Sequence, residues 1–123
     1  MAILETSARN AACDAIVDLI DAGASAGTLV FETSADVEVA TLTFSDPAFG
    51  TAAMGVATAG SIGSDSSATG GTVAQASFYD SDSNKVLEVT VSTSGADINL
   101  SSINLSAGDV VSVTSLTVTV PAS

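Results

Sequence analysis

The sequence contains no histidine, no tryptophan and a single cysteine among its 123 residues. Without histidine the chain cannot form a Ser-His-Asp triad or a histidine-based zinc site, and a lone cysteine excludes an intrachain disulfide. Cys13 lies beside the apolar stripe of a predicted helix, so we expect a packed thiol and not a reactive one. We therefore predict that the protein is not an enzyme and that it uses no cofactor.

Basic residues are also scarce, because Arg9 and Lys85 stand against fourteen acids and leave a formal net charge of −12. Such a charge repels phosphate, so we expect neither nucleic acid nor an anionic membrane as a partner. No apolar run approaches the roughly 18 residues of a membrane span. The amino terminus lacks the basic and apolar regions of a secretory signal, and we expect folding in a cytoplasm or export by a route that this sequence does not show.

Hydrophobic residues nevertheless make up 46% of the chain, which is too many for a disordered acidic tail. They are mainly alanine and valine, and aromatic residues contribute only 4%. A core of small side chains buries little area per residue. We therefore expect burial to come from a sheet that closes on itself or from packing against other subunits.

One helix is predicted over about residues 7–22, with Thr6 or Ser7 as its cap and Gly23 just past its end. Apolar residues recur along it at the spacing of one helical face, and we expect this stripe to pack on a sheet or a neighbouring helix. The stripe consists of Ala8, Ala12, Ala15, Ile16, Leu19 and Ile20. The polar face consists mainly of Asn10, Asp14, Asp18 and Asp21.

After residue 26 the sequence changes to short alternating segments separated by turn residues, which is typical of strands. The predicted strands cover 28–32, 37–44, 51–59, 73–79, 85–92, short pieces within 98–105, and 110–120. About seven or eight such strands predict a mostly β chain, folded as one antiparallel β-sandwich or barrel-like domain. We divide the chain into a helical segment, 1–26, that packs on the domain or on a neighbour, and a β domain, 27–123.

The most suggestive acidic cluster is Asp80, Asp82 and Asn84, in a predicted hairpin turn. Oxygen ligands at alternate positions match the opening of an EF-hand loop. The match then ends, since Lys85 occupies the position that needs glycine and Val91 the one that needs glutamate. We expect a polar turn held by local hydrogen bonds, with a weak calcium site as the alternative.

Several motifs follow one another in an order that is similar to that of a known group of proteins. They are Ala-Arg-Asn-Ala at 8–11, Phe-Ser-Asp-Pro-Ala-Phe-Gly at 44–50, the Ala/Gly run through Gly55 and Ala59, Ala-Thr-Gly-Gly-Thr at 68–72, Phe78-Tyr79, Ser-Gly-Ala-Asp-Ile-Asn-Leu at 94–100 and Ala-Gly-Asp-Val-Val-Ser-Val-Thr-Ser-Leu at 107–116. Over nearly its whole length the chain resembles small virion structural proteins of tailed bacteriophages and prophages. The resemblance implies a capsid decoration, or cement, protein on the outer surface of the phage head.

On this interpretation the chain binds the major capsid protein. It also associates with further copies of itself, as a homo-oligomer that is a trimer or a dimer. The interface candidates are Ile3, Leu4, Ala8, Ala12, Ile16 and Leu19. Two alternatives stay open. One is a minor tail or receptor-binding component of adhesin type, which would more often carry long repeats or exposed aromatic residues. The other is a free calcium- or carbohydrate-binding β-sandwich outside any virus.

Overall fold

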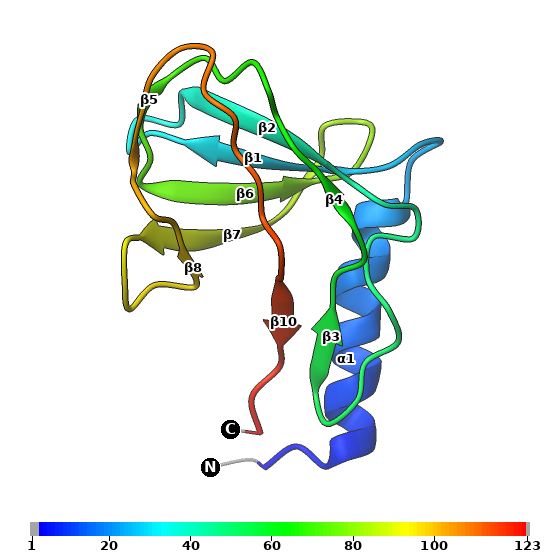
Figure 1. Cartoon of the computed structure of the whole chain (residues 1–123). Coiled ribbons are helices and arrows are strands. Elements are labelled where there is room, and N and C mark those ends of the chain that lie inside the picture. The colour runs from blue at the N-terminus through cyan, green and yellow to red at the C-terminus, as the bar shows by residue number, and fades with distance from the viewer. Residues whose placement is uncertain (1–2, 123) are drawn as a thin grey trace.

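The computed structural model describes residues 3–122 and contains one α-helix and ten short strands (Figure 1). Helix α1 (Thr6–Asp18) continues into a single 3-10 turn, η1 (Leu19–Asp21). The strands are β1 (Thr28–Glu32), β2 (Glu38–Phe44), β3 (Val56–Thr58), β4 (Ile62–Gly63), β5 (Gly71–Thr72), β6 (Gln75–Tyr79), β7 (Lys85–Ser92), β8 (Ile98–Asn99), β9 (Asn104–Leu105) and β10 (Thr117–Thr119). The predicted class, mostly β with one N-terminal helix, is confirmed. The predicted helical segment, 1–26, and the predicted β domain, 27–123, include residues 1, 2 and 123, which lie outside the described residues.

A curled six-stranded sheet in the order β4-β2-β1-β6-β7-β8 forms the body of the domain (Figure 1). Its pairings are antiparallel except for the short parallel contact of β7 with β8. Two further ribbons, β3 with β10 and β5 with β9, complete the fold. Helix α1 packs against the first of these ribbons in its own chain.

The core lies on one face of the six-stranded sheet, because alternate side chains of its central strands point to that side. Leu29 and Phe31 of β1 and Phe78 of β6 are fully buried there. Phe44, Phe49 and Phe78 form an aromatic cluster with ring centroids 5.6–6.4 Å apart. Four of the five aromatic residues are phenylalanine, and three of those four meet here, so the few large side chains are concentrated at one point.

Several local predictions are wrong, including the strand over 51–59, which is regular only in β3. Helix α1 begins one residue early, with Glu5 at its N-cap, so Thr6 and Ser7 lie inside the helix and neither caps it. The predicted strand over 110–120 is regular only in β10, and Val111 instead makes an isolated bridge with Asp65. Strict alternation would place Val111 and Leu116 on opposite faces, yet both are buried. The chain therefore changes direction between them.

Candidate functional site

Helix α1 is attached to the domain through polar side chains. Three backbone N–H groups of the loop before β3 donate hydrogen bonds to side-chain oxygens on the helix. The pairs are Gly55 to Asn10 at 2.8 Å, Ala52 to Asp14 at 2.8 Å and Ala48 to Asp21 at 2.9 Å. We call this set the helix clamp. It gives the loop the hydrogen-bond acceptors that its irregular backbone needs.

Apolar contacts accompany the clamp on the same side of the helix. Cys13, Val17 and Ile20 are between 0% and 2% exposed. The Cys13 thiol donates to the carbonyl of Val118 at 3.3 Å, and the Arg9 Nε–H donates to the carbonyl of Val120 at 2.9 Å. The helix is thus fixed to both strands of the β3–β10 ribbon, and Cys13 is packed, as predicted.

Only Ile20 of the predicted apolar stripe is fully buried on the domain, so the prediction that the stripe packs on a sheet is corrected, and its packing on a neighbour stays a prediction. Ile20 is buried, but Leu19 is 55% exposed and Ala8 and Ala15 are also exposed. At 100° per residue, the buried residues Cys13, Val17 and Ile20 are centred roughly 110° around the helix from the predicted stripe. The physical reason is the helix clamp, because the loop needs oxygen acceptors and the asparagine and aspartates of the predicted polar face supply them.

The six interface candidates are therefore exposed or half-buried, two before the helix and four along its outward side, and we call them together the outer helix face. It consists of Ile3, Leu4, Ala8, Ala12, Ile16 and Leu19. Ile3 is 71% and Leu4 41% exposed, and Ala12 and Ile16 are half-buried. The Leu4 N–H donates to the carbonyl of Ala122 at 2.7 Å, which ties this end of the segment to the end of the β domain.

The predicted calcium candidates lie in the β6–β7 turn, where Asp80 holds the turn together. Its Oδ1 accepts the N–H groups of Asp82 and Asn84, both at 2.9 Å, and its Oδ2 accepts the Asn84 side-chain amide at 3.1 Å. The hydrogen bonds from Asn84, and then that from Asp82, lower the pKa of Asp80 from its ordinary value of 3.8. Asp80 therefore acts as an acceptor within the turn, while Asp82 and Asn84 are exposed.

A second acidic cluster was missed by the sequence reasoning. Carboxylate oxygens of Glu32, Asp36 and Glu88 lie within 4.8 Å of one another. Glu32 is only 4% exposed and accepts the hydroxyl groups of Ser77 at 2.6 Å and Tyr79 at 3.1 Å. Carboxylates are ligands that hard cations prefer, but the two hydroxyl groups already give Glu32 its partners. No sequence spacing identifies this cluster, because it depends on β6 lying between β1 and β7.

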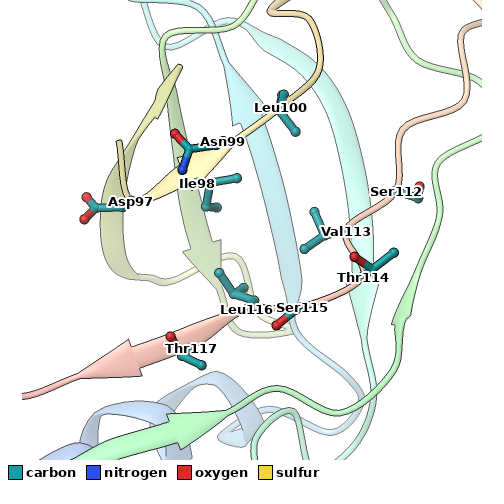
Figure 2. A pocket seen from close by; sticks show the side chains of 10 residues that line it. All are labelled: Asp97, Ile98, Asn99, Leu100, Ser112, Val113, Thr114, Ser115, Leu116 and Thr117. Atoms are coloured by element: carbon teal, nitrogen blue, oxygen red, sulfur yellow. The ribbon is translucent and has the colours of Figure 1, made fainter. Parts of the chain in front are cut away.

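A groove of about 370 Å³ lies between β7 and β10, with Leu87, Val89, Leu116 and Val118 among its lining residues. A hollow of about 330 Å³ adjoins it beside β8. Figure 2 shows Ile98, Leu100, Val113 and Leu116 around this hollow, with Asp97 and Thr117 toward its rim. The lining carries mainly aliphatic and hydroxyl groups, which suits contact with another protein better than small-molecule chemistry.

Comparison of the chain with protein-family models, with curated proteins and with solved structures finds no match. Among residues 3–122, no helix has the length and apolar character needed to cross a membrane.

Proposed function

We propose that this protein is a structural virion component, a capsid decoration protein that binds the outer surface of a phage head through its outer helix face. The observation that carries the proposal is the exposure of Ile3, Leu4 and Leu19 beside a helix whose opposite side is fixed to the domain. Exposed large apolar side chains are candidates for protein contact sites. The partner that we propose is the major capsid protein.

The helix clamp supports this proposal through rigidity. Hydrogen bonds to Asn10, Asp14 and Asp21 span most of the length of the helical segment and fix its orientation on the ribbon. A surface that is already ordered loses less conformational entropy on binding. The outer helix face is therefore suited to docking on a repeated, rigid lattice.

The charge of the chain supports a place outside the capsid. A net charge of −12 opposes contact with packaged DNA, and it does not oppose contact with the outer shell. The face of the sheet opposite the core carries Glu88, which is exposed, and Thr41, which is half-buried. A decoration protein needs such a solvated surface on the side that points away from the head.

The test is binding of the purified full chain to phage heads that lack it, with the variant Leu19→Asp. We expect L19D to lower the affinity for heads at least tenfold, because it places a charge in the apolar contact. Val37→Asp is the matched control, since Val37 is 58% exposed but lies in the β1–β2 turn, far along the chain from the helix. V37D should bind as the wild type does.

Two outcomes would overturn the proposal. One is equal loss of binding in L19D and V37D, which would remove the outer helix face from the contact. The other is a cryo-EM map of native particles that places the protein only at the tail, which would favour a minor tail or receptor-binding component.

A further inference from the structure

We propose that two copies of this chain pair through the open edge of β10, forming an antiparallel β10–β10 contact about a two-fold axis. The inference deepens the proposed function, because it names the surface through which decoration proteins would meet each other on a head, and for that role it rests on the proposed function. It concerns a different surface from the outer helix face.

The register of the β3–β10 ribbon shows which backbone groups of β10 are open. The Ala59 N–H donates to the Leu116 carbonyl at 2.9 Å, and the Val120 N–H donates to the Gly55 carbonyl at 2.8 Å. The even-numbered residues in and beside β10 therefore bond toward β3, and the N–H and C=O groups of Thr117 and Thr119 point away from it. Among residues 3–122, β10 pairs with β3 alone.

The opposite edge of the same ribbon is covered. The Gly50 N–H donates to the Thr58 carbonyl at 2.9 Å, and Ala53 and Val56 exchange backbone hydrogen bonds, both at 2.9 Å. The loop before β3 thus acts as a third, irregular strand. Within residues 3–122, the β10 side of the ribbon is the side that presents unpaired backbone groups in a row.

The parts of β2 and β7 that the short edge strands β4 and β8 leave uncovered are also protected, by means that natural sheets use against unwanted pairing. On β2, Asp65 Oδ2 accepts the Thr41 N–H at 2.9 Å. On β7, Asp97 Oδ2 accepts the Thr90 N–H at 3.1 Å, and an exposed ion pair between Lys85 and Glu88 lies further along the strand. The β10 edge has no such charge or cap, which is the pattern of an edge that is kept for a partner.

The distribution of charge along the chain favours a second copy as that partner. Residues 110–122 contain no charged side chain, in a chain whose net charge is −12. Two acidic molecules approach each other at least cost where both surfaces are neutral. Asp97 also lines the groove, and an uncharged incoming strand is not repelled by it.

The strand is self-complementary. If the two-fold axis passes through Val118, Thr117 of each copy lies opposite Thr119 of the other, and the two open residues of each strand exchange four backbone hydrogen bonds. Cross-strand threonine pairs stabilise antiparallel sheets. The groove beside β10 has a volume of about 370 Å³ and apolar lining residues, including Leu87 and Val89, that the second copy would cover. Such a two-fold contact is complete with two copies, so it produces a closed dimer.

The experiment is sedimentation equilibrium of the full chain, whose monomer mass is 12.0 kDa, over a dilution series from millimolar to micromolar. Thr117 and Thr119 are exposed, so charges at these positions leave the core intact. We expect Thr117→Glu with Thr119→Glu, and Thr117→Lys with Thr119→Lys, each to raise the dimer dissociation constant at least tenfold, because like charges face each other across the axis. Thr117→Glu with Thr119→Lys should retain the dimer, because opposite charges then face each other twice.

Circular dichroism melting of each variant confirms that the monomer remains folded. A wild-type chain that stays monomeric at millimolar concentration, or that sediments as a trimer, would overturn the inference. So would a dimer that survives both like-charge variants. The result is independent of head binding: a monomer that decorates heads refutes this inference alone, and a dimer that does not bind heads refutes the proposed function alone.

Discussion

Two aspartates in this chain have opposite environments. Burial, and then repulsion from Asp46 and Asp18, raises the pKa of Asp21 above its ordinary value of 3.8, although its hydrogen bond from the Ala48 N–H acts in the other direction. The pKa of Asp80 is lowered by the donors of its turn. Charge on Asp21 therefore costs stability in the folded state, whereas charge on Asp80 contributes to it.

At the residue scale we predict that Asp80→Ala lowers the Tm by a few degrees at pH 7, because two backbone N–H groups and the Asn84 amide lose a charged acceptor. Since the folded-state pKa of Asp80 is depressed, its contribution is complete above the ordinary pKa of 3.8 and is lost as the pH falls through the folded-state value. Circular dichroism melts from pH 7 to pH 2 should show that the difference in Tm between D80A and the wild type decreases as the pH falls.

Asp82→Ala is the matched control for that prediction. Asp82 is exposed, and among the described residues its side chain accepts no hydrogen bond, so its loss should leave the Tm unchanged at every pH. Equal effects of D80A and D82A would show that the turn does not depend on the Asp80 carboxylate.

At the scale of elements, the helix clamp decides how α1 sits on the domain, and it gives a direct test. Asp14→Ala removes the acceptor of the Ala52 N–H, a residue that is only 7% exposed. We expect a loss of about 1–3 kcal/mol in the free energy of unfolding, because a buried donor is left without a partner. Asp14→Asn keeps an acceptor oxygen at the same place and should cost less than half as much. Urea unfolding monitored by circular dichroism measures both.

The elements also show how much of the fold the sequence alone predicts. Strands β1 and β7 have the bounds predicted for them, because alternation between turn residues is a local signal. The outward direction of Leu19 was not predictable in this way, since periodicity assumes that the apolar side is buried. The acceptors required by Ala48 and Ala52 are visible only once the loop has a conformation. Alternation over 110–120 predicts a long strand, but a strand needs a neighbour, and β3 reaches only Thr117–Thr119.

The acidic cluster of Glu32, Asp36 and Glu88 could not be predicted from the sequence, for a related reason. Glu32 and Glu88 are 56 residues apart, and they approach because β6 pairs with both β1 and β7. The order of strands in a sheet is set by packing of the whole chain, not by local spacing. The interface candidates near the amino terminus came from a local count of hydrophobic side chains, and which of them are exposed depends on how the helix packs.

At the scale of the whole molecule, net charge opposes the self-association that an uncharged strand edge favours. Two copies bring together two charges of −12, and this repulsion acts over the Debye length, about 10 Å in 0.1 M salt and about 3 Å in 1 M salt. We therefore predict that the β10 dimer becomes tighter as sodium chloride is raised, by roughly tenfold between low and high salt.

This dependence separates the proposed contact from one held by opposite charges, because salt weakens an interface built on ion pairs. Sedimentation equilibrium across a salt series measures the change. The variant with Thr117→Glu and Thr119→Lys provides an internal contrast, since its two added ion pairs should make its dimer less dependent on salt than that of the wild type. A wild-type dimer that dissociates as salt rises would place the contact on charged groups and away from residues 110–122, where the chain carries none.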